Sequence, residues 1–250
     1  MLNSILFGLY PYVAIAVFLA GSLIRFDREQ YTWRSGSSQL LQRKMLMWGS
    51  NCFHVGVLAI LAGHFVGLLT PHEWYTGLGL SVPNKQLLAM AAGGVFGLVC
   101  LLGITLLVMR RLGDARIRAT SSPMDIAILL MLFAQLLLGL SSIFVSAQHL
   151  DGAEMLKLAG WAQHIVTLQT DAAGLMADVH PIFKLHILLG LTIFLVFPFS
   201  RLVHIWSVPL GYIGRSYQVV RRRGGPAGGT QQVGQRRPLE HVARRMPAGR

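Results

Sequence analysis

Long apolar stretches alternate with short polar connections along this chain, and the pattern predicts membrane-spanning helices. A spanning helix needs roughly 20 mostly apolar residues. Five stretches qualify, at about residues 5–24, 46–69, 87–109, 126–145 and 182–206. The sequence lacks the strict alternation that is typical of strands. The expected fold class is therefore an all-α integral membrane protein with a bundle of five transmembrane helices.

The composition supports this prediction, because 53% of the residues are hydrophobic and only 13% are charged. Ordinary soluble domains are less apolar. No basic residue precedes the first apolar run and no small-residue cleavage site follows it, so we expect a spanning helix rather than a removable signal. The two cysteines, Cys52 and Cys100, both lie in predicted spans. Two cysteines cannot form a disulfide framework or a four-thiolate iron–sulfur cluster, and no C-x-x-C-H motif is present for covalent haem attachment.

Basic residues are distributed unevenly between the two sides of the predicted bundle. Of the 22 lysines and arginines, 18 follow the first, third or fifth span and Arg201 lies just inside the end of the fifth. The other side holds only Lys85, Lys157 and Lys184. The positive-inside rule then places the N-terminus outside and the C-terminus in the cytoplasm. The net charge of +12 is thus explained without a nucleic-acid partner. We expect residues 1–223 to form the membrane domain and residues 224–250 to form a disordered basic cytoplasmic tail.

Four histidines lie inside two of the apolar stretches, His54 and His64 in the second and His186 and His204 in the fifth. Ionisable residues at membrane depth are costly and usually face the protein interior, where they have a function. Imidazole is also a common ligand of haem iron. Because the two helices are antiparallel, depth pairs His54 with His204 and His64 with His186. The hypothesis is two stacked haems, each held between the same two helices.

The spacing of these histidines supports the hypothesis only in part. Eighteen residues at about 100° each put His186 and His204 on one helix face, and ten residues leave His54 and His64 about 80° apart. The axial separations are about 27 Å and about 15 Å, so a difference of roughly 12 Å must be absorbed by tilt, ligand height or a kink at Pro198. Two imidazoles would fill both axial positions of an iron, which favours electron transfer. The expected electron donor is a quinol dissolved in the lipid.

Other features have two interpretations or an expected structural role. Lys85 either extends to the lipid headgroups or binds the polar head of a lipid-soluble ligand near His64. The connection at 25–44 is either a solvated loop or a docking surface. Residues 153–168 have helical periodicity, which predicts an amphipathic helix that either lies along the outer membrane surface or caps the bundle. Its predicted apolar face consists of Met155, Leu158, Ala159, Ala162 and Ile165. Gln135 is expected to donate an interhelical hydrogen bond, and a structural or interfacial role is expected for His149, His164 and His180.

Motifs from all parts of the chain resemble one known family. They are YPYVAIAVFLAGS, QYTWRSGSSQLLQRK, SNCFHVGVLAILAGHFVGLLTPH, SAQHLDGAEMLKLAGWAQ and FPFSRLVHIWSVP, in this order. The sequence resembles the gamma subunit of membrane-bound respiratory nitrate reductase, a dihaem cytochrome b, from about residue 10 to residue 217. The tail beyond about residue 223 is longer and more basic than the family pattern.

This resemblance implies that His54 and His204 bind the inner haem b and that His64 and His186 bind the outer one. It implies a quinol site beside the outer haem, with Lys85 and His64, that accepts menaquinol or ubiquinol. The implied partners are a cytoplasmic iron–sulfur beta subunit and a molybdenum-containing alpha subunit, in the inner membrane of a bacterium. The alternatives are a dihaem subunit of a different quinone-linked reductase, a transporter or proton channel with a histidine relay, and a haem-free anchor.

Overall fold

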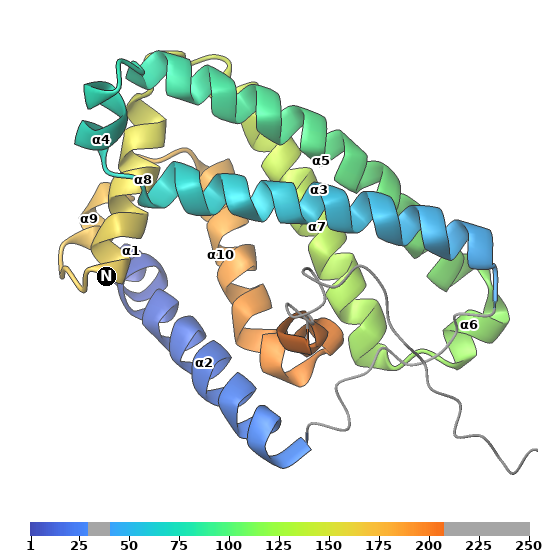
Figure 1. The fold of residues 1–250 in the computed structure, drawn as a ribbon. Helices are drawn as coiled ribbons and strands as arrows, with labels where there is room; N and C mark the ends of the chain where they lie inside the picture. The colour runs from blue at the N-terminus through green and yellow to red at the C-terminus, as the bar shows by residue number, and fades with distance from the viewer. Residues whose placement is uncertain (30–40, 208–250) are drawn as a thin grey trace, which may run out of the picture. The chain divides into compact units, whose positions relative to one another are not determined.

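The computed structural model describes residues 1–29 and 41–207, and the secondary structure of these residues is entirely helical. Five helices among them are long and apolar enough to cross a membrane, which confirms the expected all-α fold with five spans (Figure 1). The spans are Leu2–Arg28, Arg43–Leu69, Val82–Gly113, Pro123–Ser146 and Pro181–Phe199. The predicted tail at 224–250 and the proposed domain boundary lie outside the described residues, as do residues 30–40 of the first connection.

The first span consists of α1 (Leu2–Ser4), a π-helical segment (Ile5–Leu9) and α2 (Tyr10–Glu29). Pro11 has no amide hydrogen to donate to the carbonyl of Phe7, four residues earlier. The indole Nε1–H of Trp161 donates to that carbonyl instead, at 2.9 Å. A distant side chain therefore satisfies the backbone group that the proline leaves without its usual α-helical partner.

Helices α3 (Arg43–Leu69) and α5 (Val82–Gly113) lie side by side and form the most extensive helix pair of the described chain (Figure 1). Glycine makes this approach possible. A Cβ at Gly56 would lie 2.5 Å from the Cβ of Cys100, and a Cβ at Gly103 would overlap the backbone of Phe53. Small residues at such contacts bring helix backbones together in membranes. Along the chain, the short helix α4 (His72–Gly77) lies in the connection between α3 and α5, outside the five spans.

Polar caps define where the later helices begin. Ser81 accepts from the amide of Asn84 at the start of α5, which is five residues earlier than the predicted start. After α6 (Ala115–Ala119), Ser122 and Asp125 form a reciprocal capping box at the start of α7 (Pro123–Ser146). Such a box satisfies two amide hydrogens that have no partner within the helix.

The predicted amphipathic helix is present as α8 (Ala153–Val166), followed by α9 (Ala172–Leu175). Its expected apolar face is largely covered, and Trp161, which the periodicity did not include, is also buried. A buried cluster connects α8 and α9 with the first and last spans. It contains Phe7, Ala14, Trp161, Ile165, Ala172, Met176, Val179, Phe183 and Leu191.

The last span differs from the prediction of one helix over 182–206. The α-helix α10 covers Pro181–Val196, and two 3₁₀ segments follow at Phe197–Phe199 and Arg201–Ser207. Pro198 lacks an amide hydrogen and cannot continue the α-helical ladder. The predicted bend at Pro198 is therefore a complete end of the α-helix. His204 consequently lies in a separate 3₁₀ segment, and the expectation that His186 and His204 share one face of a continuous helix was wrong.

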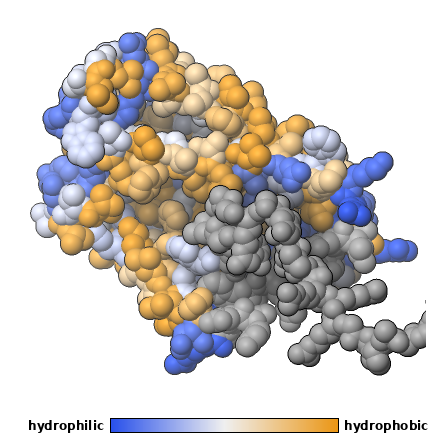
Figure 2. All heavy atoms as spheres, viewed as in Figure 1, coloured by the Kyte–Doolittle hydropathy of each residue, from blue (hydrophilic) through white to orange (hydrophobic). Residues whose placement is uncertain are grey.

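Large apolar side chains remain exposed along the spans, including Leu58, Phe65, Val95 and Phe144. In Figure 2, hydrophobic residues cover much of the visible face and hydrophilic residues gather mainly at its margins. Exposed contiguous apolar surface of this kind indicates contact with lipid or with a partner. The five apolar helices and this surface indicate a multi-pass membrane protein.

Candidate functional site

The four predicted histidines form two pairs in the structure. The ring centres of His54 and His204 are 6.3 Å apart, and those of His64 and His186 are 6.1 Å apart. The pairing is the one that was expected from depth, although a 3₁₀ segment rather than α10 carries His204. Helices α3 and α10 are not among the extensively packed helix pairs of the described residues, so side chains rather than close backbone packing connect them at these histidines.

Both separations fit two imidazoles on opposite sides of one metal ion. An imidazole nitrogen lies about 1.1 Å from its ring centre and bonds a first-row metal at about 2.0–2.1 Å. The two ring centres of a metal-bridged pair should then be about 6.3 Å apart, which agrees with both values. The rings are inclined by 69° in the first pair and 36° in the second. In the described residues, no group of three or more His, Cys, Asp or Glu side chains is arranged to hold a metal ion.

Backbone hydrogen bonds orient three of the four rings. The Nδ1–H of His54 donates to the carbonyl of Ser50 at 2.7 Å, and that of His64 donates to Ile60 at 2.9 Å. The Nδ1–H of His204 donates to the carbonyl of Arg201 at 2.6 Å. A carbonyl can only accept, so Nδ1 carries the proton and the lone pair remains on Nε2. This tautomer is the one that metal-binding histidines adopt when a carbonyl orients them.

His186 is held differently, by α7. Its Nε2 lies 3.4 Å from the amide nitrogen of Gln135, and its ring packs against Gly139, where a Cβ would lie 3.0 Å from its Cε1. The contact confirms the predicted interhelical role of Gln135. The buried Nδ1 of His186 has no hydrogen-bond partner. A buried polar nitrogen without a partner is costly at membrane depth, and a ligand that binds Nδ1 would remove that cost.

Lys85 is only 8% exposed, and its ammonium lies 3.9 Å from the ring centre of Tyr75. No hydrogen bond or ion pair joins it to His64 in the described residues. The interpretation of Lys85 as a residue that reaches the headgroups does not fit this burial. Burial raises the pKa of the Tyr75 hydroxyl, and the charge of Glu73 raises it further. The sequence analysis did not identify Tyr75 as the partner of Lys85. The sequence feature that could have indicated this contact is an aromatic residue ten positions before the lysine, in the connection between two spans.

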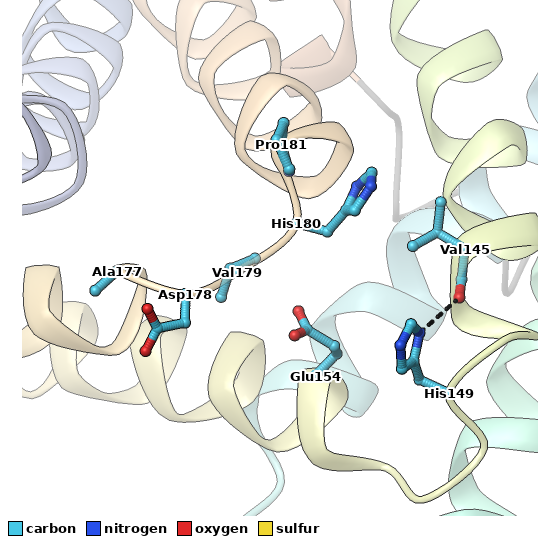
Figure 3. A pocket seen from close by; sticks show the side chains of 8 residues that line it. All are labelled: Val145, His149, Glu154, Ala177, Asp178, Val179, His180 and Pro181. Carbon is cyan, nitrogen blue, oxygen red and sulfur yellow. Dashed lines mark hydrogen bonds between the residues drawn. The ribbon is translucent and has the colours of Figure 1, made fainter.

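The other histidines have mainly structural contacts. His180 accepts from the amide of Ile182 and caps α10, and His164 pairs with Asp171 at 2.8 Å. His149 and His180 also line a cavity of about 400 Å³ together with Glu154 and Asp178 (Figure 3). This cavity does not include any of the four paired histidines.

Comparison with known proteins identifies the family. The sequence pattern of the nitrate reductase gamma subunit matches residues 3–223. The chain is 54% identical over 222 residues to the respiratory nitrate reductase 1 gamma chain of Escherichia coli, which covers 89% of this chain and 98% of that protein. This chain belongs to the nitrate reductase gamma subunit family.

More distant members give the same result. The nitrate reductase gamma chain of Bacillus subtilis is 39% identical over 223 residues, covering 89% of this chain and all of that protein. The nitrate reductase-like protein NarX of Mycobacterium tuberculosis is 31% identical over 225 residues, which are 34% of its own length. The resemblance inferred from the sequence motifs is therefore confirmed. The gamma subunit described here is one component of a multi-subunit nitrate reductase, an oxidoreductase.

Proposed function

We propose that this gamma subunit oxidises quinol near the outer membrane face and delivers the electrons to a cytoplasmic iron–sulfur beta subunit. The molybdenum-containing alpha subunit would then reduce nitrate. The observation that carries the proposal is the pair of imidazole separations, 6.3 Å and 6.1 Å, at two depths between the same two parts of the chain. Each pair would hold one haem b, the inner one between His54 and His204 and the outer one between His64 and His186.

When bound, each haem would supply a one-electron iron couple. His54 and His204 would hold one haem, and His64 and His186 would hold the other. The protein residues determine the geometry of this centre. Carbonyls on the same chain segment fix His54, His64 and His204 as Nδ1–H tautomers, which increases the basicity of Nε2. Gln135 and Gly139 restrict the ring of His186.

Lys85 and His64 are the proposed residues of the quinol site. Lys85 can donate to a quinol oxygen, and the ring of Tyr75 holds its ammonium within the helix bundle. We place the N-terminus outside and the cytoplasmic face at the basic connections, following the charge distribution. Protons from the quinol would then leave on the outer side. Each electron that moves inward works against about 2.3 kcal/mol per 100 mV of membrane potential.

The test is the haem content of the purified complex and of two pairs of variants. The unsubstituted complex should contain two non-covalent haems in this subunit that are reduced by added quinol. His64→Ala and His186→Ala should each remove the same haem, and His54→Ala and His204→Ala should each remove the other. His180→Ala is the matched control, because this histidine caps α10 outside both pairs. Retention of both haems in all four variants would refute the assignment.

A further inference from the structure

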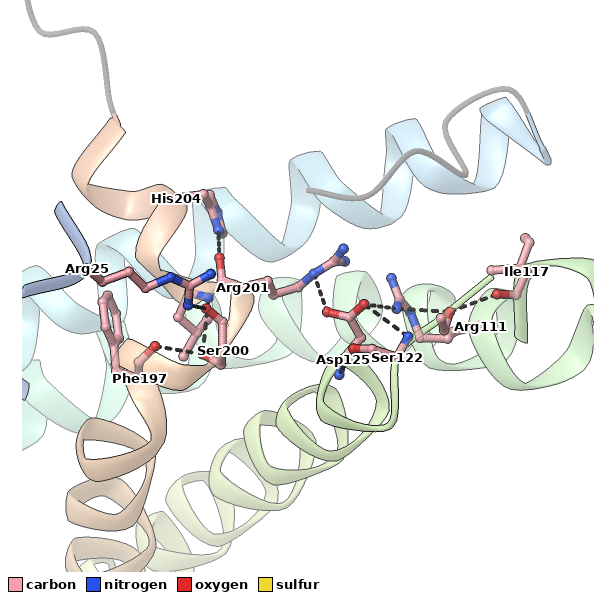
Figure 4. Close-up of polar contacts among 11 residues, drawn as sticks. Arg25, Arg111, Ile117, Ser122, Asp125, Phe197, Ser200, Arg201 and His204 are labelled. Atoms are coloured by element: carbon pink, nitrogen blue, oxygen red, sulfur yellow. Dashed lines mark hydrogen bonds and ion pairs between the residues drawn. The ribbon is translucent and has the colours of Figure 1, made fainter. Parts of the chain in front are cut away.

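The segment that carries His204 is held by a group of charged side chains from three other helices. Its members are Arg25 of α2, Arg111 of α5 and Asp125 of α7, together with Arg201 of the segment itself (Figure 4). None of these residues belongs to the histidine pairs. Arg201 is nevertheless the residue whose carbonyl accepts the Nδ1–H of His204, at 2.6 Å.

Asp125 is the centre of this group. One carboxylate oxygen lies 2.9 Å from Nε of Arg201 and the other lies 3.7 Å from a terminal nitrogen of Arg111. The side chains of Asp125, Arg111 and Arg201 are 18%, 11% and 24% exposed. Ion pairs with this little solvent are screened weakly, and removal of one partner leaves an uncompensated charge. Without Asp125, two arginines would face each other at this position.

Arg25 holds the preceding turn. Its terminal nitrogen donates to the carbonyls of Pro198 and Ser200 at 2.6 Å and 3.1 Å. The hydroxyl of Ser200, a residue only 2% exposed, accepts from the amide of Leu202 and so begins the 3₁₀ segment. Arg25 of α2 therefore holds the turn, and Asp125 of α7 holds Arg201, the first residue of the 3₁₀ segment.

We propose that Asp125 is a positioning residue for His204. Asp125 holds the side chain of Arg201, and the carbonyl of Arg201 orients the imidazole of His204 toward His54. His54 and His64 obtain the equivalent carbonyl from their own α-helix, four residues earlier. His204 lies beyond the end of α10, so the carbonyl of Arg201 that accepts from His204 has to be held in place by contacts from other helices. This inference rests on the proposed function, because it concerns the haem that His54 and His204 would bind.

The test compares Asp125→Asn with Ser122→Ala in the full complex. Ser122→Ala removes one partner of the capping box of α7, whereas Asp125→Asn keeps an oxygen that can accept from the amide of Ser122. Only Asp125→Asn removes the ion pair with Arg201. The readouts are haem per chain, the midpoint potential of each haem, and the electron paramagnetic resonance signal of each haem, which reports the geometry of its two imidazoles.

Asp125→Asn should change the signal and potential of the inner haem and lower its affinity by about tenfold, the lower end for loss of a group that orients a ligand. The outer haem should not change, and Ser122→Ala should leave both haems unchanged. Arg201→Gln should reproduce the inner-haem effect, which provides a second test if Asp125→Asn does not assemble. Asp125→Glu should restore at least part of the inner-haem signal.

The possible failures can be distinguished. If the unsubstituted subunit lacks two haems, the proposed function is wrong. If it contains both, and Asp125→Asn and Arg201→Gln leave the inner haem unchanged, only the positioning role is refuted. An equal loss of both haems in these variants, or the same loss in Ser122→Ala, would show a general structural role and would also refute the inference.

Discussion

Replacement of Tyr75 should test whether its aromatic ring holds the ammonium of Lys85 in place in the proposed quinol site. The ammonium of Lys85 lies 3.9 Å from the centre of this ring, well within the roughly 6 Å range of a cation–π interaction. Such contacts contribute about 0.5–1 kcal/mol at exposed sites and about 2 kcal/mol or more when desolvated. Tyr75 is 6% exposed and Lys85 is 8% exposed, so the larger value applies.

A loss of about 2 kcal/mol in the positioning of Lys85 corresponds to roughly a 30-fold weaker interaction with quinol. Tyr75→Leu should therefore raise the quinol KM by about 10-fold to 30-fold. Tyr75→Phe retains the aromatic face and should change KM by less than about threefold. The assay is quinol-dependent nitrate reduction by the membrane complex at several quinol concentrations, with a soluble electron donor that bypasses the gamma subunit as the control.

Equal KM values for Tyr75→Leu and Tyr75→Phe would refute the idea that the ring positions Lys85. A normal KM for Lys85→Ala would refute the place of Lys85 in the quinol site itself. Both outcomes would leave the two histidine pairs unaffected, because neither Tyr75 nor Lys85 contacts them through a hydrogen bond or ion pair in the described residues.

Two further predictions concern stability. Gly56→Leu should lower the thermal stability of the purified subunit by about 1–3 kcal/mol, the usual cost of overpacking, because even a Cβ would lie 2.5 Å from Cys100. The control is Gly93→Ala, whose Cβ meets no atom within 4 Å. Equal stability of the two variants would contradict the packing argument. The raised pKa of Tyr75 means that the folded state holds this proton more tightly than the unfolded state. The resulting stability is present below about pH 10 and is lost as the pH rises through the folded pKa. Melting temperatures of Tyr75→Phe should therefore decrease less above about pH 10 than those of the unsubstituted protein, and parallel decreases would refute this.

The sequence predicted the features that depend on local pattern. Apolar length identified the five spans, and the depth of four histidines in two antiparallel stretches gave the observed pairs. The end of α10 was harder to predict, because a proline in an apolar run can either kink a membrane helix or end it. The outcome depends on contacts that the sequence pattern does not reveal. Here Arg25 donates hydrogen bonds to the carbonyls of Pro198 and Ser200.

The charged group around Asp125 could not be derived from periodicity. Asp125 and Arg201 are far apart in the sequence, and their ion pair depends on how α7 and the last segment pack. A signal was nevertheless present. Asp125 is the acidic residue of a capping box, SSPMD, between connections that are otherwise rich in arginine. A carboxylate close to several arginines at the end of a predicted span is expected to form ion pairs, because uncompensated charges are expensive at low solvent exposure.

The end of α10 at Val196 accounts for the axial mismatch that the sequence left open. His54 and His64 are ten residues apart on α3, which is about 15 Å. From His186, α10 also continues for ten residues before it ends at Val196. A continuous α-helix would have carried His204 roughly 12 Å beyond the depth of His54. Because the helix ends and a 3₁₀ segment follows, His204 comes within 6.3 Å of His54. The proline that ends the helix and the ion pairs that hold the next segment are thus two parts of one arrangement, which gives both histidine pairs nearly the same separation.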